Sequence, residues 1–403
     1  MRILHVIPTV ANRDGGPSRA VIGMCREANR RGAHAEIFTT NLDGPGTHNV
    51  PCGVPVDRDG VQVTHFPVAI SGTYKISPML ASALRRKIPS CDVAHIHSLY
   101  QFPSTAAAFY CRKFGVPYIL RPHGTLDPYL FSRHRGRKLL YELLIERRNL
   151  RCAAAVHFVT EEERRLAAQS KLLFNPVVVP FGIDFDDLPA LRDRTAMEAE
   201  WPETRGRHVI LFLGRVNFKK GLDILAKAFG TIARSRCDVV LLVAGPDNEG
   251  YASRVRGWLQ EEGVQKNTVF TGLLTGRRKV AVLAGASLFV LPSYTENLGV
   301  AVVEAMAAGL PVVISRHVNI CREVADAHAG FVTDNSPREV AAAILRLIEQ
   351  PELALTLGKN GRRLALSRFS WDFTGPRLMH LYADVAAKRI ATNLAPARVP
   401  TSP

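Results

Sequence analysis

The feature that most constrains this chain is a regular alternation of short apolar runs with amphipathic stretches along nearly its whole length. Apolar runs followed by helical patterns are typical of parallel α/β sheets, in which a crossover helix joins each strand to the next. The 403 residues exceed what one hydrophobic core usually holds, so we expect two domains. The predicted fold class is therefore α/β, with two Rossmann-like doubly wound domains facing each other across a cleft.

The alternation predicts the main elements of both halves. In the first half we expect strands near 2–8, 34–40, 61–66, 92–98, 117–123, 153–159 and 177–181, and helices near 17–31, 78–88, 103–114, 136–152 and 160–169. In the second half we expect strands near 208–213, 239–244, 268–271, 287–291, 311–314 and 330–333, with helices between them and one near 337–349. Residues 184–207 are polar and contain proline, which predicts a linker.

Charge and cysteine usage narrow the partners and the compartment. Lysine and arginine number 52 against 36 acidic residues, so the net charge of +16 predicts an anionic partner: nucleic acid, anionic lipid or a phosphorylated small molecule. Seven scattered cysteines without a CxxC pair indicate free thiols in a reducing compartment. No apolar run is long enough to span a bilayer, and the first ten residues resemble a strand and not a signal peptide. We expect a cytoplasmic protein.

A basic loop follows the strand HVILFL in the second half. In GRVNFKKG, residues 214–221, Arg215 lies at the end of the strand and Lys220 lies just before the next helix. A guanidinium, an ammonium and a helix N-terminus at one place form a phosphate site, although a solvated basic loop gives the same pattern. A Walker A motif is absent from the sequence.

The stretch PSYTENLGVAVVEAMAAGLP, residues 292–311, combines a strand end, a turn and a helix. The backbone N–H groups of Asn297 to Val300 are expected to hold an anion. Glu304 could accept hydrogen bonds from ribose hydroxyls, and Glu296 could face a sugar. The alternatives are that Glu296 complements the helix N-terminus and that Glu304 lies on a solvent-exposed helix face. The apolar neighbours of Glu304 argue against the second alternative.

Three stretches of the first half also end strands. DGGPSRAV contains Gly15 and Gly16, which permit close approach of the backbone to a ligand, although these glycines by themselves favour a plain tight turn. His123 in RPHGTLDP and His97 in HIHS follow strands, so each could contact sugar hydroxyls or serve as a structural histidine. The basic, leucine-rich stretch 132–151 predicts either a helix drawn to anionic lipid or a helix packed on the core with a solvated basic face.

Taken together, these motifs resemble the retaining glycosyltransferases of family 4, which have the two-domain GT-B fold. GRVNFKKG, AGPDNEG, FTGL and PSYTENLGVAVVEAMAAGLPVV occur in the family's order, and the resemblance extends from residue 1 to about residue 388. It implies that Gly16, Arg215 and Lys220, with backbone near Leu298 and Gly299, hold the donor diphosphate. Further implied contacts are Glu296 with the transferred sugar, Glu304 with ribose, Leu273 backbone with the base, Gly245 with the nucleotide pocket, and His123 with the reacting sugar.

The resemblance also implies the domain plan and the reaction. The acceptor side would span 1–185 with the helix 371–390 packed back on it, the donor side 186–370, and 391–403 would be a disordered tail. The activity implied is transfer of a sugar from a UDP- or GDP-sugar to a hydroxyl of a glycan or lipid-linked acceptor, with retention and without metal, cofactor or nucleic acid. The acidic triplets 57–59 and 184–186 receive no metal role. Contact of 132–151 with the inner membrane face stays open.

Two departures from the family pattern and two rival functions remain. Leu298 stands where the family usually has phenylalanine, and Phe181 stands where asparagine is common, for which the sequence offers no reason. A nucleotide-sugar 2-epimerase would share the layout and use carboxylates on the sugar ring. A non-catalytic protein binding anions or nucleic acid would use the basic surface and tolerate loss of Glu296.

Overall fold

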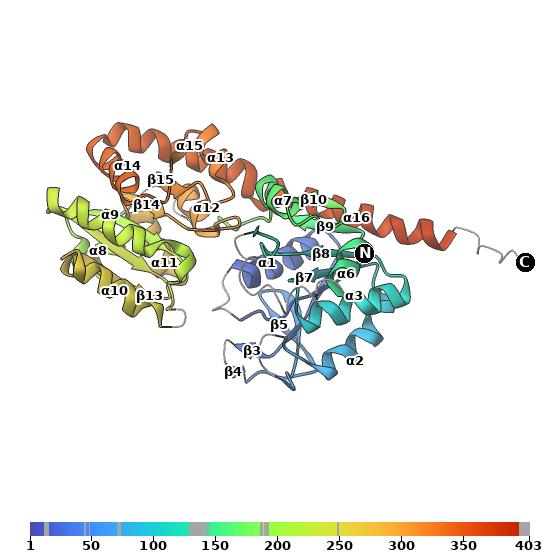
Figure 1. The fold of residues 1–403 in the computed structure, drawn as a ribbon. Coiled ribbons are helices and arrows are strands. Elements are labelled where there is room, and N and C mark those ends of the chain that lie inside the picture. Colours follow the sequence, from blue (N-terminus) through green and yellow to red (C-terminus); the bar gives the residue numbers. More distant parts are fainter. Residues whose placement is uncertain are drawn as a thin grey trace, which may run out of the picture. The chain divides into compact units, whose positions relative to one another are not determined.

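The computed structural model describes residues 1–11, 16–43, 46–47, 49–70, 74–128, 141, 145–185, 188, 193–247 and 250–394. The chain divides into two compact units, which are considered one at a time. Unit 1 comprises Met1–Gly182 and Trp371–Pro403, and unit 2 comprises Ile183–Ser370. In Figure 1 the last helix, drawn in red, lies with the blue and green elements of unit 1.

Unit 1 is built on an eight-stranded sheet in the order β10-β9-β8-β7-β1-β2-β6-β5. All neighbours are parallel except β5 and β6, which form an antiparallel pair at one edge. The strands of this unit, including the separate pair β3–β4, are β1 Arg2–Val6, β2 His34–Thr40, β3 Leu42–Asp43, β4 Gly46–Thr47, β5 Pro55–Arg58, β6 Val61–Phe66, β7 Val93–His97, β8 Tyr118–Arg121, β9 Ala155–Phe158 and β10 Pro176–Val178. The seven strands predicted for this half are confirmed, and β3, β4 and β5 were not anticipated.

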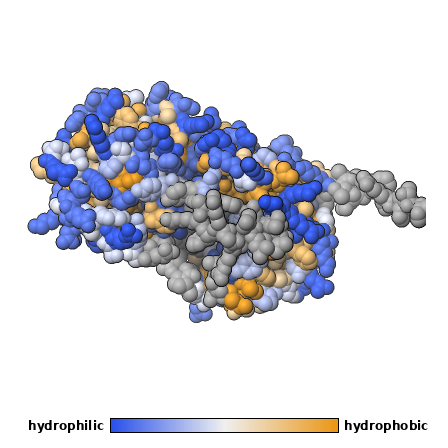
Figure 2. All heavy atoms as spheres, in the orientation of Figure 1, coloured by the Kyte–Doolittle hydropathy of each residue, from blue (hydrophilic) through white to orange (hydrophobic). Residues whose placement is uncertain are grey.

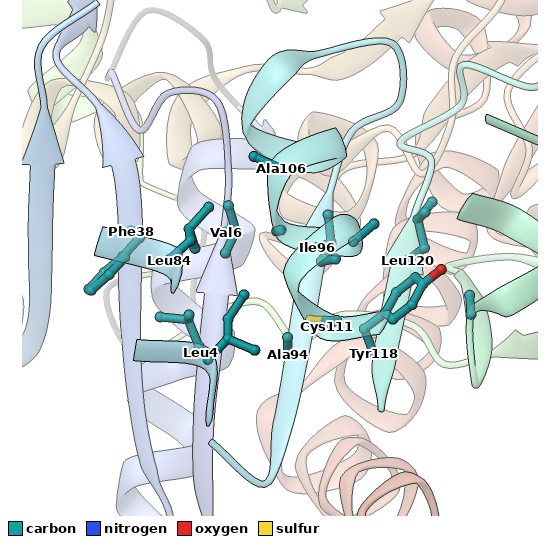
Figure 3. Close-up of a cluster of buried hydrophobic side chains, with 14 of the residues drawn as sticks. Leu4, Val6, Phe38, Leu84, Ala94, Ile96, Ala106, Cys111, Tyr118 and Leu120 are labelled. Carbon is teal, nitrogen blue, oxygen red and sulfur yellow. The ribbon is translucent and has the colours of Figure 1, made fainter. Parts of the chain in front are cut away.

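Side-chain alternation gives this sheet two different faces. On one face, neighbouring strands supply apolar side chains such as Leu4, Ile96 and Leu120, which pack with Leu84 and Cys111 of the covering helices (Figure 3). The opposite face carries a second cluster in which residues of β1, β2 and β7 pack with the first and last helices of the unit. Residues of opposite parity on one strand therefore belong to different cores.

The helices of unit 1 are α1 Gly16–Arg30, α2 Pro78–Lys87, α3 Phe102–Phe114, α6 Arg147–Cys152, α7 Glu161–Ala168 and α16 Trp371–Leu394. The helix predicted over 136–152 lies partly outside the described residues, since 136–140 and 142–144 are not described, and α6 covers its end. Thr160 caps α7 by accepting a hydrogen bond from the backbone N–H of Glu163, as expected. The Glu163 carboxylate reaches further, accepting hydrogen bonds from the N–H groups of Val159 at 2.8 Å and Gly124 at 2.9 Å.

Unit 2 contains a fully parallel six-stranded sheet in the order β13-β12-β11-β14-β15-β16. The strands are β11 His208–Leu213, β12 Val239–Ala244, β13 Thr268–Gly272, β14 Leu288–Leu291, β15 Val312–Ser315 and β16 Gly330–Thr333. The strand order reverses between β11 and β14. Ligands of open α/β sheets bind outside the carboxyl ends of the strands at such a switch point. The loops after β11 and β14 are therefore the expected ligand-binding loops of this unit.

The helices of unit 2 are α8 Thr195–Glu200, α9 Leu222–Ser235, α10 Tyr251–Glu261, α11 Gly276–Gly285, α12 Val300–Ala307, α13 Cys321–Asp326, α14 Pro337–Glu349 and α15 Pro351–Phe369. Helix α8 lies within the range 184–207 that the sequence predicts as a linker, so part of that range is folded. Met197 and Trp201 are buried there, and Met197 packs against Gly285 of α11. Their spacing of four residues is a helical signal that the polar composition around them concealed.

One face of the molecule is mainly polar where its residues are described (Figure 2). Figure 2 shows a largely hydrophilic face on which apolar residues are scattered in small groups. Among the described residues, no helix is both long and apolar enough to cross a bilayer. All seven cysteines lie in described positions and are free thiols.

Candidate functional site

The loop after β11 is tied to the strand end of β14. Gly221, with φ +65°, is the N-cap of α9, and a Cβ atom at this position would lie 1.9 Å from the carbonyl oxygen of Pro292. Tyr294 donates its backbone N–H to the Lys219 carbonyl at 2.7 Å and its hydroxyl to Asp223 at 2.6 Å. The two loops at the switch point of unit 2 therefore form one structure, and a glycine is required where they approach most closely.

This contact brings Lys220 and Glu296 together, 76 residues apart in sequence. The Lys220 ammonium forms an ion pair with the Glu296 carboxylate, and the two side chains are 17% and 19% exposed. The backbone of Glu296 is fixed as well, since its N–H donates to His317 and its carbonyl accepts from Asn319, each at 3.0 Å. The Glu296 side chain is thus paired with Lys220, while its backbone is held by the segment that follows β15.

Arg215 and the start of α12 complete the cationic side of this region. Arg215 is exposed on the loop directly after β11. Gly299, with φ +69°, is the N-cap of α12, and among the described residues no side-chain oxygen caps this helix. Leu298, just before it, is buried, while Asn297 accepts a hydrogen bond from the Asn319 side chain at 3.4 Å. The first amides of α12 and two basic side chains thus occur on neighbouring loops, which suits an anion.

Glu304 is buried within α12 and pairs with a lysine that the sequence did not single out. Its carboxylate accepts a hydrogen bond from Lys279 of α11 at 2.5 Å, and the side chains are 10% and 14% exposed. The solvent-exposed alternative for Glu304 is therefore wrong, because the neighbouring apolar residues of α12 are buried too. Nothing in the pattern RRKVAVLAG distinguishes Lys279 from the arginines before it, since only the neighbouring helix provides the partner.

Gly245 and Leu273 lie at the carboxyl ends of the next two strands. Gly245 follows β12 with φ +149°, and a Cβ atom here would lie 1.8 Å from the carbonyl oxygen of Gly214. Its N–H donates to the Gly272 carbonyl at 2.8 Å. Leu273 follows β13 and is 47% exposed, so its backbone is accessible at the same edge of the sheet. The site residues predicted in the second half thus all lie at the strand ends of unit 2 or on α12.

In unit 1, His123 is held in an unusual backbone conformation. Its φ of +54° is in the left-handed region that residues other than glycine rarely adopt, and such strain is frequent at functional sites. The Glu163 carboxylate fixes the next residue by accepting the Gly124 N–H. Gly16 is the first residue of α1, whereas Gly15 lies outside the described residues.

His123 belongs to a cluster of five histidines, of which sequence reasoning selected two, His97 and His123. The other members lie on β1, β7 and β9 at positions that alternation directs to the face covered by α1 and α16, and they are joined by an arginine and a tyrosine. These residues are His5, His95, His157, Arg121 and Tyr382. Polar side chains at alternate positions of apolar strands, as in VAHIH, were the available signal.

Burial keeps the histidines of this cluster neutral. Together with the nearby Arg121 guanidinium, it lowers the pKa of His5 and of His157 to about 3. For the same main reason the pKa values of His95, His97 and His123 fall well below 6.5. Neutral imidazoles both donate and accept hydrogen bonds, which suits them to hydroxyl groups.

Arg121 explains the unusual residue Phe181. The arginine is 2% exposed, and its guanidinium lies over the Phe181 ring at 5.2 Å from the centroid. Burial lowers the pKa of Arg121 to about 10, and Glu163 is the main acidic group that opposes this shift. An aromatic face interacts favourably with a buried cation, so phenylalanine has a physical role at this position.

The acidic triplets can be placed only in part. Asp57 lies in β5 and Asp59 in the turn between β5 and β6, where Asp57 accepts a hydrogen bond from the Gly60 N–H at 3.2 Å. Of the second triplet, Asp184 is described and Asp186 is not. In the described part of the chain, the one group of three side chains with spacing suited to a metal ion is His5, His95 and His97.

Comparison with known proteins identifies the family. Residues 193–364 match the family described as Glycosyl transferases group 1, and residues 15–182 match the Glycosyl transferase 4-like domain. The chain belongs to this glycosyltransferase family.

Two relatives match this glycosyltransferase over most of its length. It is 28% identical to a GDP-mannose-dependent alpha-(1-6)-phosphatidylinositol dimannoside mannosyltransferase of Mycobacterium tuberculosis, over 97% of this chain and 98% of the relative. It is 27% identical to an alpha-maltose-1-phosphate synthase of Mycolicibacterium smegmatis, over 88% and 95%.

Solved structures give the fold. Sucrose-phosphate synthase from Thermosynechococcus elongatus matches with a TM-score of 0.79 at 19% identity, covering 96% of this chain and all of that one. Anabaena HepE in complex with UDP-glucose matches with a TM-score of 0.75 at 17% identity, covering 95% of this chain and all of that one. The glycosyltransferase therefore has the GT-B fold that its sequence predicts.

Proposed function

We propose that this glycosyltransferase moves a sugar from a nucleoside diphosphate sugar to a hydroxyl group of a glycan or lipid-linked acceptor. The observation that carries the proposal is the arrangement at the switch point of unit 2. There the Lys220–Glu296 pair, the exposed Arg215 and the start of α12 occur on two loops fastened to each other. A pyrophosphate needs cations and backbone N–H groups, and a sugar needs a carboxylate beside them.

The proposed reaction breaks the bond between the anomeric carbon and the diphosphate oxygen. The acceptor oxygen forms the new bond on the same face of the sugar, and its proton passes to the departing diphosphate, so the anomeric configuration is retained. The negative charge that grows on the leaving group is stabilised by Arg215, Lys220 and the first amides of α12. These cations support the proposal that no divalent ion is required.

The substrate classes come from relatives and from the donor site. One relative is GDP-mannose-dependent by name, and one neighbouring structure contains UDP-glucose, so uridine and guanosine diphosphate sugars are the proposed donors. Glu304 would receive the ribose hydroxyls, and the backbone beside Leu273 would meet the base. The proposal includes a cytoplasmic location. Contact of the basic stretch 132–151 with an anionic membrane surface rests on its sequence alone.

The test measures sugar transfer and thermal stabilisation with a panel of UDP- and GDP-sugars, with and without EDTA. One donor should raise the melting temperature and support transfer that EDTA does not abolish. Glu296→Ala should lower turnover about 100-fold or more, whereas Glu203→Ala, an exposed carboxylate of the same unit, should not.

Three outcomes would contradict the proposal. If Glu296→Ala transferred sugar at the wild-type rate, the assignment of Glu296 to the donor site would be wrong. Activity lost with EDTA and restored by manganese would remove the metal-independent mechanism. An epimerised nucleotide sugar without transfer would favour the isomerase alternative.

A further inference from the structure

Six hydrogen bonds join a backbone carbonyl of unit 1 to His123. We call this set the histidine chain; it contains five imidazoles and one phenol, all buried except His123, which is partly buried. In order, the bonds are His157 Nε2 to Val179 O at 2.6 Å, His157 Nδ1 to His95 Nε2 at 3.3 Å, His95 Nδ1 to Tyr382 OH at 3.0 Å, Tyr382 OH to His5 Nε2 at 3.2 Å, His5 Nδ1 to His97 Nε2 at 3.0 Å, and His97 Nδ1 to His123 Nε2 at 3.1 Å.

The first three hydrogen bonds of the histidine chain have a fixed donor-to-acceptor direction. They start at the Val179 carbonyl, which can only accept a hydrogen bond. A carbonyl oxygen has no proton, so the Nε2 of His157 donates to Val179. A neutral imidazole has one N–H, which leaves Nδ1 of His157 as an acceptor for the Nε2–H of His95. The Nδ1 of His95 then accepts, and the hydroxyl of Tyr382 donates to it.

The directions of the other three hydrogen bonds follow because Tyr382 has already donated its one hydroxyl proton to His95. Its oxygen now accepts from the Nε2–H of His5, so the Nδ1 of His5 accepts from the Nε2–H of His97. The Nδ1 of His97 in turn accepts from the Nε2–H of His123. Every ring is thereby assigned, from its partners, as the Nε2–H tautomer, and His123 is left with an unprotonated Nδ1.

The assignment requires neutral rings, and the surroundings provide this condition. Four of the rings are buried and His123 is partly buried, and the Arg121 guanidinium disfavours a second positive charge at each of the five. Among the described residues, His97 is the hydrogen-bond partner of His123. The Nδ1 lone pair of His123 is therefore the end of the histidine chain.

A metal site is the competing reading of the same rings. His5, His95 and His97 each offer one nitrogen, and these atoms lie within 4.8 Å of one another. Both nitrogens of each of these rings are, however, already hydrogen-bonded within the histidine chain. A metal ion would have to displace several of those bonds, so the hydrogen-bonded reading accounts for more of the geometry.

We propose that the histidine chain fixes the tautomer of His123, so that its Nδ1 presents a lone pair and accepts a hydrogen bond from a substrate hydroxyl. Tyr382, from the last helix, and the four other histidines are positioning residues. The functional part of this inference rests on the proposed sugar transfer, while the tautomer itself does not. The unprotonated Nδ1 of His123 thus favours a substrate hydroxyl, which can donate a hydrogen bond, over a substrate group that can only accept one.

The first experiment determines the ring tautomers directly. Full-length protein labelled with ¹⁵N-histidine is studied at pH 7.5 by long-range ¹H–¹⁵N correlation, with rings assigned by single substitutions. We expect His123 to be neutral with its proton on Nε2. A proton on Nδ1, or a charged ring, would overturn the proposal, as would one equivalent of zinc in the purified protein.

The second experiment interrupts the chain in its middle. Tyr382→Phe removes the hydroxyl, so His5, His97 and His123 lose their connection to Val179 and should show mixed tautomers, while His157 keeps its own. Tyr118→Phe is the matched control, because this buried tyrosine donates to the Asn149 carbonyl at 2.6 Å and lies outside the chain. The control should leave all five rings unchanged, and altered rings in the control or unaltered rings in Tyr382→Phe would contradict the proposal.

A third pair of variants tests the carbonyl end and the link to activity. His157→Gln retains one donor and one acceptor and should preserve the His123 tautomer, whereas His157→Leu should not. Loss of one hydrogen bond to substrate predicts that Tyr382→Phe lowers kcat/KM for transfer about fivefold relative to Tyr118→Phe. Equal kcat/KM in the two tyrosine variants would refute the role in substrate binding. If no donor supports transfer in the wild type, the proposed function fails while the ring tautomers still decide the histidine chain.

Discussion

The two units carry different chemistry on similar parallel sheets. In unit 1 the strands carry neutral imidazoles on the face covered by α1 and α16, and these are hydrogen-bonded to each other and to His123. In unit 2 two ion pairs, Lys220 with Glu296 and Lys279 with Glu304, lie on the loops and helices that follow the strands, as does the exposed Arg215. Neutral groups of mixed donor and acceptor character match hydroxyls, and charged groups match an anion. Similar sheets can therefore carry unlike side-chain chemistry in the two units of one chain.

Burial explains why the charges differ. Removing an isolated ionisable group from water favours its neutral form, and imidazole becomes neutral near physiological pH at little cost. Lysine and glutamate remain charged only when paired and partly hydrated, and the residual exposure of 10–19% at the two pairs of unit 2 is consistent with that requirement. The stability of unit 1 therefore depends on pH through its neutral imidazoles. In unit 2 each charged side chain of the two ion pairs depends on its oppositely charged partner.

The largest expected effect is acid destabilisation of unit 1. The folded pKa values of its five clustered histidines lie below the unfolded value of 6.5, so the unfolded state binds more protons as pH falls. Stability is complete above pH 6.5 and falls below it, until the pH reaches the folded values, about 3 for His5 and His157. Between pH 7.5 and 5.5 five neutral rings predict a loss of up to about 7 kcal/mol in unit 1. Hydrogen exchange measured for each unit tests this.

A matched pair of substitutions sharpens that prediction. His157→Gln removes one buried titrating ring and should make the pH dependence shallower, by about 1.4 kcal/mol over the same interval. His380→Gln on α16, whose side chain is 79% exposed, should leave the slope unchanged. A unit 1 whose stability is equal at pH 7.5 and 5.5 would mean that these rings are charged when folded.

The next effect concerns the close backbone contacts of unit 2. Gly245→Ala places a methyl group 1.8 Å from the Gly214 carbonyl oxygen at a φ of +149°, which no small side-chain movement relieves. We expect a loss of about 3 kcal/mol or more in the free energy of unfolding of unit 2, measured by urea denaturation. Gly257→Ala in the middle of α10 meets no atom within 4 Å and should instead stabilise the unit by up to about 1 kcal/mol. Equal effects of the two would contradict this account of the loop.

A somewhat smaller difference in activation free energy is expected between alanine substitutions of the two lysines in the loop after β11. Lys220→Ala should reduce the turnover of sugar transfer about 100-fold, or about 2.7 kcal/mol, because its ammonium is proposed to stabilise the leaving diphosphate. Lys219→Ala changes a lysine whose side chain lies near the Phe218 ring and should reduce turnover less than about threefold. Steady-state kinetics with the active donor measures both, and similar losses in the two variants would make the charge effect nonspecific.

The smallest effects on stability are expected for exposed ion pairs, which both units contain. Arg164→Ala breaks an exposed ion pair with Glu161 in unit 1, and Arg234→Ala breaks one with Glu262 in unit 2. Each arginine is about half-exposed or more, so solvent screens the interaction and each loss should be within about 0.5 kcal/mol. Thermal unfolding of both variants would show near-identical curves. A loss above 2 kcal/mol in either would mean that surface pairs contribute to the contrast.

Much of this arrangement could be predicted from the sequence. Local apolar periodicity placed the strands of both units, and the strand-end motifs placed Arg215, Lys220 and Glu296 on loops. The edge strand β5 was missed because it is short and polar, and α8 because its two apolar residues stand among charges. The close approach of Lys220 to Glu296 could not be obtained from either loop alone, because β14 pairs with β11 only after three further crossovers.

By itself the sequence determined the order of the elements, the two-unit plan and the family, since each depends on neighbouring residues and their spacing. Only the tertiary structure decided which strands are adjacent and which helix covers each face. Those decisions join Tyr382 to His5, 377 residues away, Lys279 to Glu304, and Phe181 to Arg121. The physical reason is that alternation fixes the face of a strand on which a side chain lies, whereas sheet order and helix packing determine its neighbours there.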